Sequence, residues 1–599
     1  MSRSAHELPF GAAVTAHGTR FRLFAPNSPH VRIALEGIEE PLSMTALGDG
    51  WHELTTTAAN AGSLYRFVLP NGARVPDPAS RFQPKDVHGP SEVIDPTAYK
   101  WKDDSWRGRA WHEAILYELH IGTFTKTGTF RAASEKLDYL VRLGVTAIEL
   151  MCVFDFAGNR NWGYDGVLLY APESAYGRPE DMKAFVDRAH AHNLMVIVDV
   201  VYNHFGPEGN LLNLYFPQVG SSRHDTPWGK SLNFDAAHGK VVRDFIVHNA
   251  LYWVEEFHVD GLRLDATHAM VDDSPTHILD ELRDRVRFPV YDRQLHLILE
   301  SEHNVEPKLQ RAEGGIVSGY TAQWNHDISH LLGSLFVDLS DPDTCGETGK
   351  LAKVLAEGFV IAAQENNPAV GCSVPPLAFV AYIQNHDLVG NRPLGERIFA
   401  DAPPEAIRAI VSVYLLLPQV PMLFMGEEWG ASTPFPFFCD YHGALADGVR
   451  KGRRDQLAKL DPLPSAEDLQ RAPDPQAEST FRSAQLVWDE IAEPSHSAWL
   501  DLYSLLIHVR QQHVVPLLTG LTQNCGFGDV IAPGAFTVTW RLKDSVQLHL
   551  LANLCRQPQT RVPPLRGRLL WQTHYTDADG TLSPWTVRWT LEEVTSGQC

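Results

Sequence analysis

The sequence predicts a (β/α)₈ barrel with an N-terminal β-sandwich and a C-terminal all-β domain. Eight short apolar runs alternate with helical patterns between residues 115 and 425. Polar residues collect where several of these runs end, and apolar residues alternate with period 2 near both ends of the chain. At about 100–200 residues per domain, 599 residues suit one large barrel with appendages.

The N-terminal part, residues 1–90, is predicted to be a small β-sandwich similar to a carbohydrate-binding module. Phe21 and Leu23 alternate with polar residues, and the same pattern recurs at residues 31–35 and 65–69. Pro, Gly and Asn separate these runs, as turns between short antiparallel strands require. Residues 91–110 are interpreted as a linker, because Pro and Asp are frequent around them.

The barrel is predicted over residues 111–530, with a short insertion at about 203–238. Helical spacing marks residues 133–143, where Leu137, Leu140 and Val141 share a face, and residues 181–192. A doubly wound open sheet would show the same periodicity, and the barrel is preferred because polar residues end so many runs. The predicted strands cover residues 115–120, 146–150, 194–200, 261–266, 295–300, 320–325, 379–384 and 421–425.

The C-terminal part, residues 531–599, again alternates with period 2, at 536–540 and 546–551, which predicts a β domain. Across the chain 73 Asp and Glu outnumber 51 Lys and Arg, a net charge of −22. This balance argues against nucleic acid and against an anionic membrane surface as partners. No apolar run of about 18 residues and no secretory signal is present, and the seven cysteines form no CxxC pair. We therefore expect a cytoplasmic protein with reduced thiols.

Four predicted strands end in carboxylates, histidines or asparagines. These ends are residues 199–204, 261–266, 297–302 and 384–387. In a barrel the carboxyl ends of the strands line one pocket, so these side chains are expected to meet there. Cleavage of an acetal needs one acid to protonate the leaving oxygen and one carboxylate for the oxocarbenium-like centre.

The residue types around these carboxylates suit that chemistry. Arg263 lies two residues before Asp265, so both point to one face of a strand, and the guanidinium should keep this Asp ionised. Neighbouring carboxylates drive their pKa values apart, which leaves one of them protonated. His204 and His386 can donate hydrogen bonds to sugar hydroxyls.

The four segments resemble the four characteristic regions of the α-amylase superfamily, over roughly residues 110–440. The resemblance implies that Asp265 is the nucleophile, Glu300 the general acid/base and Asp387 the stabiliser of the transition state. It also implies that Arg263 pairs with the nucleophile and favours Glu300 over the nearby Glu302 as the acid. The residues it places around the sugar at the −1 subsite are Asp199, His204, His386 and Tyr164, the last of which stacks under the ring.

Other segments narrow the resemblance. Glu118-Leu-His-Ile-Gly-Thr-Phe124 resembles the group of branching enzymes, isoamylases and maltooligosyltrehalose trehalohydrolases. The Phe-rich run at 433–438, with residues 162–172 and 425–430, resembles the trehalohydrolases among them. Two departures lie near the pocket: His326 stands where the first of two Asp residues is expected after Asn325, and Leu388 stands where Gln is more usual.

This resemblance implies retaining hydrolysis of the α-1,4 bond next to the terminal trehalosyl unit, with maltooligosyltrehalose and trehalose as ligands. Maltooligosyltrehalose synthase would then be the functional partner in the pathway. His268, Glu302 and Trp228 are the candidates for reading the trehalose side. No cofactor or metal is expected, since the sequence holds no HExxH motif and no calcium cage between residues 203 and 235. The alternatives are a glycogen branching enzyme acting as a transglycosidase and a non-catalytic glucan-binding protein.

Overall fold

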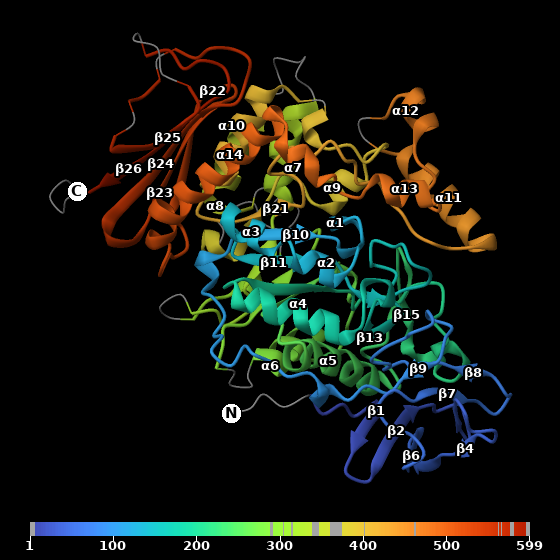
Figure 1. Cartoon of the computed structure of the whole chain (residues 1–599). Coiled ribbons are helices and arrows are strands. Elements are labelled where there is room, and N and C mark those ends of the chain that lie inside the picture. Colours follow the sequence, from blue (N-terminus) through green and yellow to red (C-terminus); the bar gives the residue numbers. More distant parts are fainter. Residues whose placement is uncertain are drawn as a thin grey trace.

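A computed structural model shows a barrel with a β-sandwich at one end and a β-sheet at the other (Figure 1). The description covers residues 6–594 and leaves out residues 288–291, 304, 313–315, 338–346, 360–373, 401, 461–462, 561, 565 and 575–579. The predicted fold class is confirmed within this part of the chain.

The eight predicted strands form one closed parallel barrel in chain order. Every residue of these strands is buried, because one face packs inside the barrel and the other lies under helices. Such strands need continuous apolar runs, which is why their positions could be predicted so closely. The strands are β10 (Leu116–Leu119), β11 (Ala147–Leu150), β14 (Met195–Val200), β17 (Gly261–Leu264), β18 (His296–Leu299), β19 (Ala322–Trp324), β20 (Phe379–Ala381) and β21 (Val420–Phe424).

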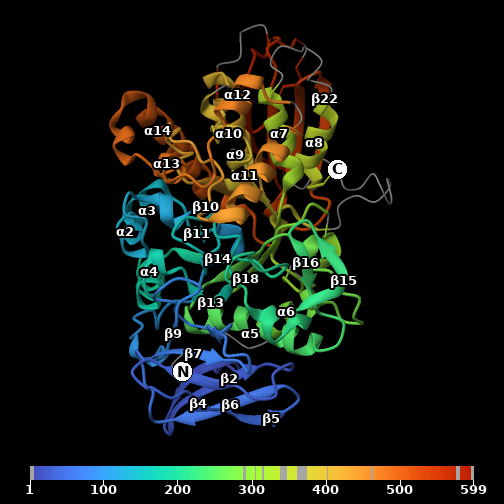
Figure 2. The ribbon, with the colours of Figure 1, turned by 90° about the vertical axis from the view of Figure 1, so that its right-hand side faces the viewer.

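Helices between the strands cover the barrel from outside (Figure 2). The helix predicted at 181–192 is α4, whose apolar residues face inward as expected. The longest of them are α4 (Pro179–Ala191), α5 (Gly239–Glu256), α6 (Ile278–Arg287), α7 (His326–Val337), α8 (Thr348–Glu357) and α10 (Pro404–Tyr414); α14 (Pro494–Val509) follows β21 and packs on α3.

The helix predicted over 133–143 is wrong in detail. Two helices occupy this region, α2 (Phe130–Ser134) and α3 (Leu137–Leu143). Thr129 begins α2 by accepting a hydrogen bond from the Ala132 amide, and Gly144, at φ 99°, ends α3. Leu137 and Leu140 are buried as predicted, whereas Val141 is 41% exposed and lies on the outer side.

The N-terminal sandwich consists of two antiparallel sheets that pack face to face. Phe21 from one sheet contacts Tyr65 from the other, with ring centroids 4.8 Å apart. The first sheet holds β1 (Gly11–Thr15), β2 (Gly18–Phe24), β6 (Trp51–Thr56) and β5 (Thr45–Gly48). The second holds β4 (Leu42–Ser43), β3 (Arg32–Leu35), β7 (Leu64–Val68) and β8 (Arg74–Val75), with β9 (Ser91–Glu92) beside β7.

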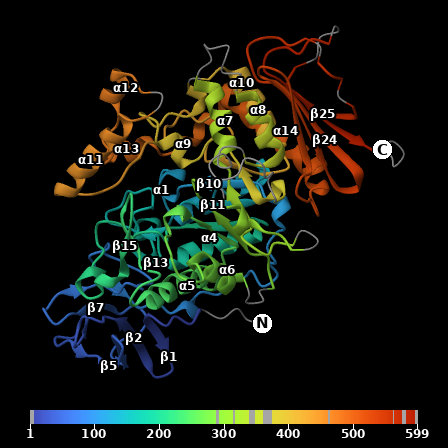
Figure 3. The same ribbon diagram turned by 180° about the vertical axis from the view of Figure 1, so that it is seen from behind.

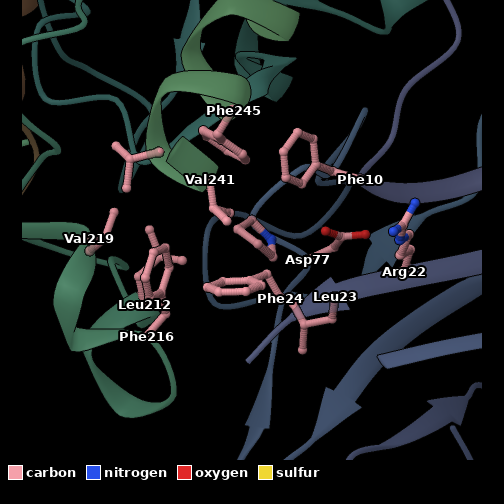
Figure 4. Close-up of a pocket in the computed structure, with 12 residues that line it drawn as sticks. Phe10, Arg22, Leu23, Phe24, Asp77, Leu212, Phe216, Val219, Val241 and Phe245 are labelled. Carbon is pink, nitrogen blue, oxygen red and sulfur yellow. The ribbon is translucent and has the colours of Figure 1, made fainter. Parts of the chain in front are cut away.

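This sandwich docks on the barrel through aromatic side chains around a small apolar pocket (Figure 4). Phe10 meets Phe245 of α5 edge to face at 5.4 Å, and Phe24 meets Phe216 at 4.8 Å. Aromatic pairs of this kind stabilise an interface beyond their buried area. The pocket therefore belongs to the junction between two domains, and its apolar walls offer little to a sugar.

At the other end, a five-stranded antiparallel sheet packs on α8 and α10 (Figure 3). Trp589 donates from its indole nitrogen to the backbone carbonyl of Ser412 in α10 at 2.7 Å. The sheet is ordered β22 (Gly526–Ala532), β23 (Ala535–Arg541), β24 (Val546–Asn553), β26 (Thr586–Glu593) and β25 (Arg568–Gln572). Three further helices project from one side of the barrel, α11 (Gly443–Leu457), α12 (Ala466–Arg471) and α13 (Glu478–Ser483).

Among the described residues, no helix has the length and apolar character needed to cross a membrane. Cys152, Cys439, Cys525 and Cys555 are buried and free. The remaining cysteines, at 345, 372 and 599, lie outside the described residues.

Candidate active site

The polar strand ends meet at the carboxyl end of the barrel around one guanidinium. Arg263, fully buried in β17, donates from Nη1 to Asp199 Oδ2 at 2.6 Å and to Asp265 Oδ1 at 2.8 Å. Its Nη2 lies 3.7 Å from Glu300 Oε2. One cation thus holds three of the predicted carboxylates together, and the guanidinium plane lies over the Trp324 ring at 4.1 Å.

The backbone that follows Asp265, the nucleophile candidate, holds the carboxylate of Glu300, the acid candidate, in place. Ala266 adopts the left-handed conformation, with φ 42° and ψ 52°, which a residue with a side chain rarely takes. This conformation lets its N–H donate to Glu300 Oε2 at 2.7 Å. Asn203, which follows β14, donates to the Asp265 carbonyl at 3.0 Å. Asp265 and Glu300 are therefore positioned by the same short turn.

Asp387 lies opposite this turn, beside a charged histidine. His386 Nε2 is 3.3 Å from Asp387 Oδ2, and its Nδ1 is 2.5 Å from Oε1 of Glu118, buried in β10. Although burial acts to lower the pKa of His386, Asp387 and Glu118 raise it well above its usual value. Burial acts to raise the pKa of Asp387, but His386 lowers it to about 2. Asp387 is thus held ionised.

Tyr164 reaches the site from the loop between β12 (Phe154–Asp155) and β13 (Leu168–Pro172). Its hydroxyl donates to Asp199 at 2.7 Å, and its ring stacks on His386 with centroids 4.8 Å apart. Gly163 makes this approach possible, because a Cβ there would come within 2.0 Å of the Cys152 carbonyl. Tyr164 therefore lies where the resemblance places it, beside Asp199 and His386.

The insertion after β14 reaches the site through one aromatic contact. A hairpin of β15 (Gly220–Thr226) and β16 (Gly229–Leu232) carries Trp228 at its turn. The Trp228 ring is 50% exposed and stacks on His204 at 5.3 Å. His204 is buried, and burial lowers its pKa, which favours the neutral ring.

The other two trehalose-side candidates, His268 and Glu302, lie next to each other. His268 Nε2 is 4.0 Å from Glu302 Oε2, and the Glu302 amide donates to His268 Nδ1 at 3.4 Å. The Glu302 side chain is 73% exposed, whereas Glu300 is buried beside Arg263. This contrast agrees with Glu300 as the acid candidate.

Three residues that the sequence analysis did not place in the site contact it directly. Glu118 anchors His386, His326 contacts Glu300 Oε1 at 2.9 Å, and Tyr382 contacts the same His326 at 3.0 Å. Glu118 stood inside a recognised motif, so its carboxylate in an otherwise apolar strand was an available signal. His326 and Tyr382, which contact each other, come from segments 56 residues apart, and no local pattern joins them.

The pKa shifts of the nucleophile and acid candidates run opposite to the directions expected from the sequence. Burial raises the pKa of Asp265, although Arg263 opposes this, so the guanidinium does not dominate as we predicted. The pKa of Glu300 is lowered, because the hydrogen bond with His326 and the charge of Arg263 outweigh its burial. The sequence analysis had noted His326 only as a departure from the family pattern.

A group that could hold a cation lies outside this pocket. His224, Asp235 and Asp273 bring their ligand atoms within 4.8 Å of one another. Arg223 already pairs with Asp235 and lies 3.8 Å from Asp273, so a guanidinium supplies the positive charge there. We assign no metal to this group.

Comparisons with known proteins agree with this geometry. A family described as "Alpha amylase, catalytic domain" matches residues 100–225, and a "Domain of unknown function (DUF3459)" matches residues 526–589. The malto-oligosyltrehalose trehalohydrolase of Deinococcus radiodurans is 40% identical over 85% of this chain and 82% of its own. That of Brevibacterium helvolum is 35% identical over 95% of this chain and 98% of its own.

The chain belongs to the malto-oligosyltrehalose trehalohydrolase family. The chain is also similar to a solved structure described as a putative alpha amylase from Salmonella typhimurium. That structure is 41% identical, has a TM-score of 0.91, and covers 97% of this chain and 99% of its own. The trehalohydrolase likeness thus spans the sandwich, the barrel and the C-terminal sheet together.

Proposed function

We propose that this chain is a glycoside hydrolase that releases trehalose from maltooligosyltrehalose by cutting the adjacent α-1,4 bond with retention. The observation that carries the proposal is the meeting of three carboxylates, Asp265, Glu300 and Asp387, within a chain that matches trehalohydrolases over nearly its whole length. Homology to these enzymes makes maltooligosyltrehalose the substrate.

In the first step, an Asp265 oxygen bonds to the sugar carbon while the glycosidic oxygen leaves with a proton from Glu300. In the second step, water replaces Asp265 at that carbon and returns a proton to Glu300. Retaining enzymes hold these two carboxyls about 5–5.5 Å apart. A single guanidinium in contact with Asp265 and 3.7 Å from Glu300 supports such a close pair.

Asp387 and His386 serve the sugar at the −1 subsite. The ionised Asp387 faces the charge that develops on the ring, and His386, held by Glu118, donates to a sugar hydroxyl. Tyr164 offers a ring face beneath this sugar, and Asp199, His204 and Arg263 complete the subsite. Fixed dipoles and charges of this kind stabilise the transition state without reorganisation.

The trehalose side is proposed to be read by Trp228, His268 and Glu302. Half of the Trp228 ring is exposed, which suits stacking against a glucose ring. His268 and Glu302 provide a donor and an acceptor close together for sugar hydroxyls. Apolar contact alone separates similar sugars poorly, so polar readers are needed for a disaccharide joined 1,1.

This substrate requires an enzyme that converts the reducing end of a maltooligosaccharide into a 1,1-linked glucose. We propose maltooligosyltrehalose synthase as this functional partner. No cofactor enters the proposed reaction.

A glycogen branching enzyme would use the same three carboxylates and pass the glycosyl group to a sugar hydroxyl instead of water. The experiment that separates the two is product analysis. Purified protein is incubated with maltooligosyltrehalose and, separately, with amylose, and the products are resolved by chromatography. The proposal predicts trehalose and a maltooligosaccharide from the first substrate and no branched glucan from the second. New α-1,6 branches would establish the transglycosidase instead, and an unchanged substrate would favour a glucan-binding protein.

A further inference from the structure

His326, the first residue of α7, lies directly against the acid candidate. Its Nε2 is 2.9 Å from Glu300 Oε1, and its Nδ1 is 3.0 Å from the Tyr382 hydroxyl. Both ring nitrogens therefore have partners, while 39% of the side chain stays exposed. No step of the proposed reaction has so far used this residue.

The two oxygens of Glu300 have different surroundings. Oε2 accepts a hydrogen bond from the Ala266 amide at 2.7 Å, and Oε1 faces His326. When Glu300 is ionised its oxygens only accept, so His326 must donate from Nε2. A neutral imidazole that donates at Nε2 accepts at Nδ1, and the Tyr382 hydroxyl is the donor available there.

The position of His326 is set by the residue before it. Asn325 is fully buried, donates to the Gly358 carbonyl at 2.9 Å and accepts from the Ile328 amide at 3.2 Å. This arrangement fixes the start of α7 and so the direction of the imidazole.

We propose, on the basis of the proposed function, that His326 is a positioning residue that holds Glu300 Oε1 from one side and leaves its other lone pair to the substrate. Two N–H groups, from Ala266 and His326, then grip the two oxygens of one carboxylate. They favour the ionised form, which is the form that follows loss of the proton to the leaving group. The same form is the base that accepts the proton of water in the second step.

Other charges also act on Glu300 and have to be separated from the effect of His326. The groups whose charges act on it directly are Arg263 in β17, Asp265 after β17 and Tyr382 after β20, while Asp387 in α9 (His386–Gly390) acts on Asp265. His326 differs from these groups because it forms a hydrogen bond with Oε1 of Glu300. Its removal should therefore change the titration of Glu300 while the other charges stay in place.

The test is the pH dependence of kcat/KM for maltooligosyltrehalose, which reports ionisation in the free enzyme. His326→Ala removes a donor to the ionised acid, so the pKa of Glu300 should rise and the alkaline limb should move up by about 0.5–1 pH unit. His326→Gln keeps an N–H donor and should restore most of the original limb. Tyr382→Phe should give a smaller shift in the same direction, because Nδ1 loses its partner.

His330→Ala is the matched control, since this exposed histidine lies one turn further along α7. Its limb should coincide with that of the wild type. If His326→Ala folds normally and its limb moves by less than about 0.2 pH unit, the inference is wrong. The same holds if His326→Gln behaves like His326→Ala.

Two measurements keep the test decisive. Infrared difference spectra with and without Glu300→Gln report the ionisation of Glu300 directly, so a slow His326→Ala enzyme can still be titrated. Trehalose release by the wild type is measured on the same preparations. If the wild type releases trehalose and the limb does not move, only the role of His326 fails. If the wild type releases none, the proposed function fails.

Discussion

Strand β17 carries a charged cluster at each of its ends, and the two clusters differ in how completely they are paired. At the amino end, Asp260 precedes the strand and is fully buried. Both of its oxygens have two partners within 3.0 Å, from segments far apart in the chain. These are Trp106 Nε1 and Arg293 Nη1 on Oδ1, and His190 Nε2 and the Val196 amide on Oδ2.

The cluster at the carboxyl end contains buried polar atoms that have no hydrogen-bond partner. Asp199 Oδ1 has no hydrogen-bond partner, and neither Nε nor Nη2 of Arg263 has one. The Asp387 side chain is half exposed. Buried polar atoms are normally satisfied, so a group of unsatisfied ones marks a place where something else completes the set. This difference supports our proposal that the open cluster binds substrate, and it assigns a stabilising role to the closed cluster.

The largest effect is expected when a carboxylate of the open cluster is replaced. Asp265→Asn and Glu300→Gln should each lower kcat by about 10³-fold or more, because each removes a group that acts on the reacting bond. The melting temperature should stay close to that of the wild type, since neither change leaves a new buried charge without compensation. Initial rates and thermal melts of the same samples check both. If Glu302→Gln is the more damaging change and Glu300→Gln is mild, the assignment of the acid is wrong.

The opposite result is expected from the closed cluster. Asp260→Asn leaves Arg293 and His190 facing a neutral side chain and should cost about 3 kcal/mol or more of unfolding free energy. The kcat of the molecules that remain folded should be near the wild-type value. Denaturant unfolding at pH 7 with rates at low temperature measures the two separately.

The pH dependence of this loss has a defined sign. Although burial opposes it, His190 and Arg293 lower the pKa of Asp260 in the folded protein. The stability it contributes is therefore present above its unfolded pKa of about 3.9 and is lost as the pH falls through the lower folded value. The difference in unfolding free energy between the wild type and Asp260→Asn should become smaller in that pH range. A constant difference, or a large fall in kcat at pH 7, would contradict the division between the clusters.

Changes at the three trehalose-side candidates test which residues next to the open cluster recognise the leaving trehalose. Trp228→Ala, His268→Ala and Glu302→Gln should each lower kcat/KM for maltooligosyltrehalose by about tenfold, if each reads the leaving trehalose. Slow hydrolysis of plain maltooligosaccharides should remain largely intact. Rates on both substrates are compared for each variant. Equal losses on the two substrates would mean that these residues hold the site together instead.

The smallest effect concerns the turn that joins Asp265 to Glu300. Glycine tolerates the left-handed conformation, so Ala266→Gly should leave stability unchanged or raise it by up to about 1 kcal/mol. Ala269→Gly is the matched control, because this nearby alanine is not in that conformation and its loss should destabilise by about 0.5–1 kcal/mol. Urea melts distinguish them. Equal destabilisation would show that the turn at Ala266 stores no strain.

The sequence was a good guide to the open cluster and a poor one to the closed cluster. Asp199, Asp265 and Glu300 lie at the ends of strands with a strong apolar signal, and Asp387 follows β20 in α9, so the barrel topology brings them to one pocket. Asp260 depends on partners from three other segments, which no local pattern connects. The contact between His326 and Glu300 could not be predicted for the same reason. The sequence predicted one helix over 133–143 because the apolar spacing continues across residues 135–136, where α2 ends and α3 begins.

The central claim is that the open cluster performs retaining hydrolysis that releases trehalose, and time-resolved proton NMR tests it most directly. Maltooligosyltrehalose has no reducing end, so the anomeric signal of the new maltooligosaccharide is read from a clean baseline. The account predicts that trehalose and the α-anomer appear together and that the β-anomer grows in later by mutarotation. Early appearance of the β-anomer would show inversion and contradict the role of Asp265 as nucleophile, and absence of the trehalose signal would contradict the proposed function itself.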